Sequence, residues 1–192
     1  MSFELDREGN LHICKEEIIA AFSKALTILF ENDIKLFEYD VQERAIAARL
    51  AMYLREIFLD IEKYNITIDV EYNRDDGDVK RRYLEDKDGW IASDIILHER
   101  GSGGFNYKND IFYCEIKKKS HSENDDAQKV KEQMTERKYQ YGINLYYLQE
   151  NIAYLDLYWF DKNSQNEENA EPQKVSYHYE LLSNALVCND KI

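Results

Sequence analysis

Two carboxylates and one lysine interrupt or end segments of this sequence that are otherwise apolar. Asp94 lies within IASDIILH (residues 91–98), and Glu115 and Lys117 lie near the end of DIFYCEIK (residues 110–117). Burying a carboxylate costs several kcal/mol unless a cation or hydrogen bonds compensate. Mg²⁺ prefers hard oxygen ligands and usually takes one or two carboxylates together with water and substrate phosphate. The pattern therefore predicts a site for a divalent metal ion.

The setting of the Glu-x-Lys triplet carries more information than the triplet itself. Alternation along a strand puts Glu115 and Lys117 on one face of the sheet. An acid followed two residues later by lysine occurs five times in this chain, close to what chance gives. Only the copy at Glu115 ends an apolar segment that follows another apolar segment with a lone acid, Asp94. This combination marks the triplet as the candidate site.

Glu43 is a third acid that could join this site. At 100° per residue it falls at the centre of an apolar stripe formed by Leu50, Leu54, Ile57 and Ile61 in a helix predicted over 41–63. One interpretation makes Glu43 part of a capping box with Asp40 as the N-cap. The other makes the helix pack on the sheet and point Glu43 at the acidic pocket. The sequence leaves both open.

The elements that must position these residues follow from periodicity and turn signals. A small hairpin is expected over 3–13, and helices are expected over 16–30, 41–63 and 124–138. Strands are expected over 66–73, 91–98, 110–117, 143–148, 152–160 and 175–182. This order predicts an α/β fold in one domain over 1–192, with a mixed sheet flanked by helices, an extra N-terminal helix and extra C-terminal strands.

The residues at these places resemble the PD-(D/E)XK nuclease superfamily, which has the restriction-endonuclease-like fold. Its core runs helix, three strands, helix, strand, and residues 40–149 follow that order. The segments ERAIAARLAMYL, DVEYNR, SDIILHERG and FYCEIKKK are similar to a group of small stand-alone bacterial members. The resemblance implies a metal-dependent nuclease that hydrolyses phosphodiester bonds in DNA.

The resemblance also implies a role for each site residue. Asp94 and Glu115 would hold Mg²⁺ or Mn²⁺ together with the Ile116 carbonyl, and Glu43 would be a further ligand or would position water. Lys117 would orient or help to deprotonate the attacking water and stabilise the charge that develops on the phosphate. Weaker candidates for contact with the substrate are Glu71, Lys118, Lys119, Lys129 and Gln133.

Charge supports an alternative function. The 192 residues carry a formal net charge of −13. Acidic residues outnumber basic ones both before and after the central segment 80–138, which itself has 13 basic and 12 acidic residues. Proteins that bind nucleic acid usually present a basic face. The alternative is therefore a catalytically silent nuclease fold, an acidic binding module or nucleic-acid mimic that contacts a protein partner.

Composition limits the setting in which either function would operate. No apolar run approaches the length of a membrane span, no export signal is visible, and the three cysteines lack metal-binding spacing. We therefore expect a cytoplasmic protein that does not enter a membrane. By analogy with the fold, a two-fold homodimer would suit cleavage of two strands.

Overall fold

A computed structural model describes most of the chain, in the ranges 2–39, 41–72, 74–75, 78–79, 92–100, 109–118, 123–148, 152–160, 171–180 and 183–189. Lys119 lies outside these ranges.

A seven-stranded mixed sheet forms the centre of the molecule, with its strands in the order β11-β10-β9-β8-β7-β6-β3. Every neighbouring pair is antiparallel except β7 and β8, which are parallel. The predicted mixed α/β architecture is therefore confirmed. The strands are β3 (Ile66–Tyr72), β6 (Ser93–Glu99), β7 (Phe112–Lys118), β8 (Tyr141–Leu148), β9 (Ile152–Trp159), β10 (Gln173–Glu180) and β11 (Ala185–Cys188).

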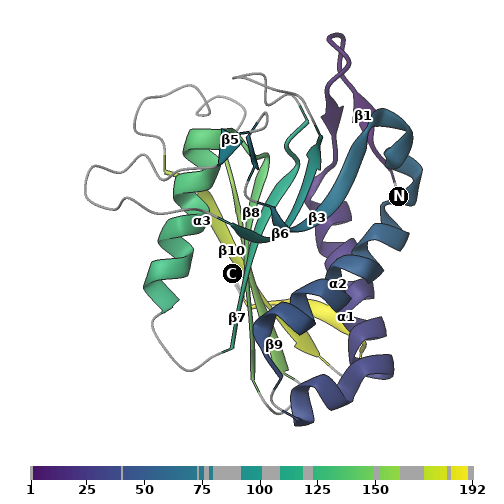
Figure 1. Cartoon of the computed structure of the whole chain (residues 1–192), viewed down its shortest axis with the longest axis vertical. Coiled ribbons are helices and arrows are strands. Elements are labelled where there is room, and N and C mark those ends of the chain that lie inside the picture. The colour runs from purple at the N-terminus through teal and green to yellow at the C-terminus, as the bar shows by residue number, and fades with distance from the viewer. Residues whose placement is uncertain are drawn as a thin grey trace.

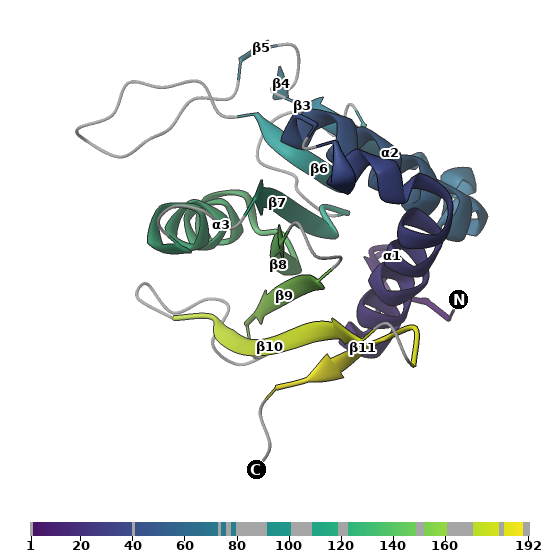
Figure 2. The same ribbon diagram turned by 90° about the horizontal axis from the view of Figure 1, so that it is seen from below.

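Helices cover both faces of this sheet. Figure 2 shows α3 on one face and α1 and α2 on the other, and Figure 1 shows α3 well separated from the α1–α2 pair. None of the helices in the described part of the chain is long and apolar enough to cross a membrane. The helices are α1 (Lys15–Glu38), α2 (Glu43–Ile57), the short 3₁₀ helix η1 (Leu59–Tyr64) and α3 (Glu123–Arg137).

The central strands β6 and β7 are buried on both faces, which explains why their sequences are apolar almost throughout. Ile95 and Cys114 belong to the large core that packs against α1 and α2. Their neighbours Ile96 and Tyr113 point to the opposite face, where they pack with Val130 and other residues of a smaller core beneath α3. Alternation therefore places Asp94 and Glu115 on the α3 face.

The structure corrects the prediction for the start of α2. The helix begins at Glu43 with Gln42 as its N-cap, so the predicted N-cap at Asp40 is wrong. The Gln42 side chain makes no capping hydrogen bond, and Asp40 itself lies outside the described residues. The helix also ends at Ile57 rather than at residue 63, because the chain continues after Phe58 as the 3₁₀ helix η1. Glu43 is thus the first residue of the helix, where its side chain can reach the end of a strand.

Other boundaries differ where local sequence signals are weak. The predicted N-terminal hairpin is confirmed as β1 (Glu4–Leu5) paired with β2 (Leu11–His12). The first helix extends to Glu38 rather than residue 30, with non-helical backbone angles at Asp33. The sequence did not predict the four-residue β11, nor the two-residue strands β4 (Arg74–Asp75) and β5 (Asp78–Val79).

Replacing Gly142 with alanine should destabilise the contact between α3 and the sheet. A Cβ atom at this position would clash with Val130 Cγ1 and lie 2.5 Å from Met134 Sδ. Overpacking of this kind costs about 1–3 kcal/mol. Urea unfolding of Gly142→Ala should show this loss, and the double variant with Val130→Ala should lose less than the two single changes added together. Full additivity would show that the predicted clash does not occur.

Candidate active site

Asp94 of β6 and Glu115 of β7 lie near the point where the pairing of these two strands ends. The antiparallel register places Ile95 opposite Cys114 and Ile96 opposite Tyr113. Extending this register by one step beyond the last paired position puts Asp94 level with Glu115 on the α3 face, and the charge of Asp94 acts on Glu115. Opposite residues on one face of an antiparallel pair interact directly. The lone acids of two apolar strands therefore lie on the same face of the sheet, where the charge of one affects the other.

The backbone pairing between these strands ends at this point. The paired positions run from Leu97–Phe112 to Ile95–Cys114, although β6 continues to Ser93 and β7 to Lys118. The Asp94 carboxylate accepts a hydrogen bond from the Ile116 N–H at 2.7 Å. A side chain thus takes the amide hydrogen that would otherwise lack a partner where the strands separate. This contact holds Asp94 against β7 without using both of its oxygens.

Glu115 is almost completely buried, with 2% of its surface exposed. Its Oε1 atom accepts a hydrogen bond from the Tyr113 hydroxyl and lies 2.7 Å from the Lys129 ammonium of α3. Burial raises the pKa of Glu115 to about 7, and the negative charge of Asp94 adds to this rise, although Lys129 opposes it. Glu115 is therefore a carboxylate whose charge is only partly compensated.

Asp94 shares this electrostatic environment. Desolvation raises the pKa of Asp94, while the Ile116 hydrogen bond and the charges of Lys129 and Lys117 act in the opposite direction. The charge of Glu43 contributes to the rise. Two neighbouring acids with raised pKa values form the kind of environment that favours binding of a cation, and perturbed pKa values are frequent at functional sites.

Lys117 and Glu43 meet at the same end of β7. The Lys117 ammonium lies 3.2 Å from Glu43 Oε2, and the backbone N–H of Lys118 donates to Glu43 Oε1 at 2.9 Å. Lys117 shares its sheet face with Glu115, whereas α2 covers the other face. The lysine reaches Glu43 because it stands near the end of the strand. The orientation of Glu43 toward the acidic region, one of the two interpretations of the sequence, matches these contacts.

The ion pair keeps Lys117 positively charged. Partial burial lowers the pKa of Lys117, but the negative charges of Asp126 and Glu43 outweigh this effect and raise it overall. At neutral pH Lys117 is thus a hydrogen-bond donor and a fixed positive charge. Of the two roles expected from the sequence, the arrangement favours orientation and charge stabilisation over removal of a proton from water.

The donor set of Asp94 and Glu115 fits a small divalent cation. Mg²⁺ needs only one or two protein carboxylates, because water and substrate phosphate supply the remaining oxygens. Among the residues that the structure describes, no three His, Cys, Asp or Glu side chains gather closely enough to hold a metal ion by themselves. Glu43, in contact with Lys117, does not complete such a group. The carboxylate pair would form the protein's share of the ligands.

The weaker candidates lie at different distances from this centre. Lys129 contacts Glu115 directly, and Lys118 contacts Glu43 through its backbone. Glu71 pairs with Arg44 near the start of α2 and has a left-handed backbone, with φ of 48°. Gln133 is 1% exposed, so a phosphate in solvent does not reach it in this conformation.

Two contributors were not identified in the sequence. Tyr113 donates a hydrogen bond to Glu115, and burial raises its pKa well above the ordinary range, so the hydroxyl remains protonated. Asn144 lies opposite Glu115 in the parallel pairing with β8 and is 3% exposed. The only sequence signal for Asn144 is a single polar residue in an apolar strand. Its position beside Glu115 depends on register, which the sequence does not specify.

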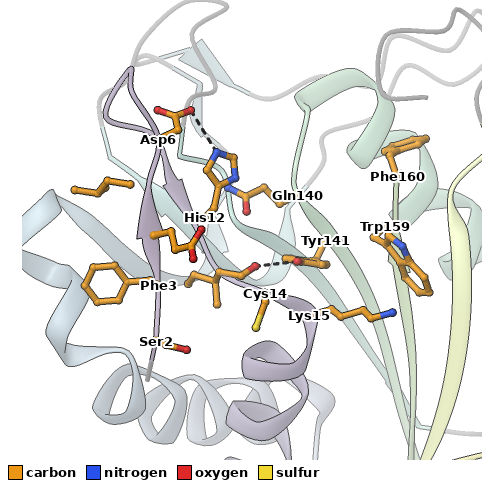
Figure 3. A pocket seen from close by; sticks show the side chains of 13 residues that line it. Ser2, Phe3, Asp6, His12, Cys14, Lys15, Gln140, Tyr141, Trp159 and Phe160 are labelled. Atoms are coloured by element: carbon orange, nitrogen blue, oxygen red, sulfur yellow. Dashed lines mark hydrogen bonds and ion pairs between the residues drawn. The ribbon is translucent and has the colours of Figure 1, made fainter. Parts of the chain in front are cut away.

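A separate cleft of about 730 Å³ lies where β8 begins and β9 ends. Figure 3 shows Tyr141, Trp159 and Phe160 on one side of this cleft and the β1–β2 hairpin on the other. The Tyr141 hydroxyl donates to the Ile13 carbonyl at 2.8 Å, and the Gln140 amide donates to the Leu11 carbonyl at 2.6 Å. These hydrogen bonds fasten the hairpin to the sheet. The candidate active site is not part of this cleft.

No family model, curated protein or solved structure matches this chain.

Proposed function

We propose that this chain is a nuclease of the PD-(D/E)XK type, which hydrolyses phosphodiester bonds in DNA with the help of Mg²⁺ or Mn²⁺. The elements α2, β3, β6, β7, α3 and β8 follow the order expected for the core of that superfamily. The observation that carries the proposal is that Asp94 and buried Glu115 lie on one face of two neighbouring central strands and interact electrostatically, with Lys117 two residues further along.

Each residue has a distinct task in this proposal. Asp94 and Glu115 supply carboxylate oxygens to the metal ion, and the Ile116 carbonyl, between Glu115 and Lys117, supplies a further oxygen. A bound divalent ion lowers the pKa of water and offsets negative charge on the phosphate. Lys117 donates to the attacking water or to a phosphate oxygen, and its fixed charge stabilises the negative charge that develops there.

Glu43 acts on the reaction through Lys117. It accepts hydrogen bonds from the Lys117 ammonium and from the Lys118 N–H, which fixes the end of β7 relative to α2. When substrate arrives, Lys117 turns toward the phosphate and Glu43 is released to position water. This assignment keeps Glu43 in the site as a positioning residue.

The silent binding module remains a second candidate function, because one contact favours it. Lys129 already supplies a positive charge to Glu115 at 2.7 Å, so the protein can stabilise this carboxylate without a metal ion. The net charge of −13 is also unusual for a protein that approaches a polyanion. In this alternative the acidic surface contacts a basic protein partner.

A cleavage assay separates the two functions. Purified protein with Mg²⁺ or Mn²⁺ is incubated with duplex, single-stranded and branched DNA. We expect cleavage of at least one substrate, and a loss on the order of 10²–10³-fold in Asp94→Asn, which removes a ligand charge. The matched control is Asp60→Asn, the same change at an exposed position in η1. Absence of cleavage on every substrate, or equal activity in Asp94→Asn, would contradict the nuclease proposal.

A further inference from the structure

The ammonium group of Lys129 lies where β6 and β7 separate. Its Nζ atom is 2.7 Å from Glu115 Oε1 and 3.3 Å from the carbonyl oxygen of Ala92, the residue just before β6. Its charge also acts on Asp94. One lysine of α3 thus contacts Glu115 of β7 and the residue that immediately precedes β6.

Lys129 supplies part of the positive charge that a metal ion would otherwise supply to Glu115. The side chain of Glu115 is 3% exposed, so its carboxylate has little help from water. Lys117 is engaged with Glu43 at the end of β7. Within the described residues, the direct ion pair of Glu115 is therefore with Lys129, so an ammonium group on a flexible side chain occupies the position next to Oε1.

The position of Lys129 on α3 allows its ammonium group to leave. The neighbouring residue Val130 packs in the core beneath the helix, which anchors this turn. The side chain of Lys129 is 24% exposed, and four methylene groups separate its charge from the backbone. The ammonium can swing into solvent without movement of α3.

We infer that Lys129 is the resident cation of the Asp94–Glu115 pair, and that a divalent ion must displace its ammonium group in order to bind. The inference depends on the proposed function only in taking a divalent ion as the competitor. The affinity of the site for metal then reflects a competition between the Lys129 ammonium and the divalent ion for the Glu115 carboxylate.

Calorimetric titration of the full chain with Mn²⁺ alone tests this inference. Lys129→Met keeps the apolar stem and removes the charge, so it should bind Mn²⁺ about tenfold more tightly than the wild type. Lys129→Arg keeps the charge and should bind about as weakly as the wild type. The matched control is Lys131→Met on the same helix, since Lys131 pairs with exposed Glu171 and should not affect binding. If thermal unfolding shows that Lys129→Met is misfolded, Lys129→Gln is titrated in its place.

The outcomes distinguish this inference from the nuclease proposal. If the wild type binds Mn²⁺ and Lys129→Met binds it equally well or more weakly, the inference about Lys129 is overturned. The nuclease proposal is unaffected by that result. Binding by the uncharged variant alone supports the inference and overturns the nuclease, because Lys129 then keeps metal out of the natural protein. Absence of binding in every variant overturns both.

Discussion

Glu115→Gln is expected to lower the rate of phosphodiester hydrolysis by about 10³-fold or more. The change keeps the size and shape of the side chain and can keep the hydrogen bond from Tyr113. It removes the negative charge that faces Asp94 and that would hold a divalent ion. Single-turnover cleavage of the preferred DNA substrate, with Mn²⁺ at saturating concentration, measures this effect.

A control variant shows whether the loss of cleavage comes from position 115 itself or from removal of any one negative charge. Glu56→Gln makes the same change at an exposed position of α2 and should cleave at the wild-type rate. If Glu115→Gln cleaves within about twofold of the wild type, a span of less than 0.5 kcal/mol in activation free energy, Glu115 has no part in the chemistry.

The same substitution should stabilise the fold above neutral pH. Burial raises the pKa of Glu115 from 4.5 to about 7, so the folded state holds a proton that the unfolded state releases. The stability that this proton provides is fully present below pH 4.5 and is lost as the pH rises toward 7. The total change is about 3 kcal/mol. Glu115→Gln should remove this dependence and be more stable than the wild type at pH 8.

Urea unfolding at pH 5 and pH 8, in the presence of a chelator, measures this difference. The advantage of Glu115→Gln over the wild type should be larger at pH 8 than at pH 5, whereas Glu56→Gln should follow the wild type at both. Parallel behaviour of all three proteins would mean that Lys129 and Tyr113 fully compensate the Glu115 carboxylate. A variant that gains stability while it loses activity is typical of an active-site residue.

The strands of the site were predictable from sequence because burial on both faces leaves an apolar pattern that a lone acid interrupts. Asp94 and Glu115 stood out for this reason. Strand alternation also predicts that Glu115 and Lys117 share one face of the sheet. The partner of Lys117 was less accessible to prediction, because a long side chain near a strand end can leave its face and reach Glu43.

Features that depend on tertiary packing were missed. The N-cap at Asp40 was favoured by its residue type, yet α2 begins at Glu43, where the side chain contacts β7 instead of capping its own helix. The contact between Lys129 of α3 and Glu115 of β7 depends on how the helix packs against the sheet. Sequence periodicity does not predict that packing. The short strand β11 was missed because four residues carry too little periodicity to be recognised.

Crystals of the full chain grown with Mn²⁺ provide the most direct test of the central claim, since anomalous scattering locates the ion. We predict one Mn²⁺ bound to carboxylate oxygens of both Asp94 and Glu115, with the Lys129 ammonium moved away from Glu115. At saturating Mn²⁺, a Lys129–Glu115 contact that persists with no ion beside these two acids would contradict the account.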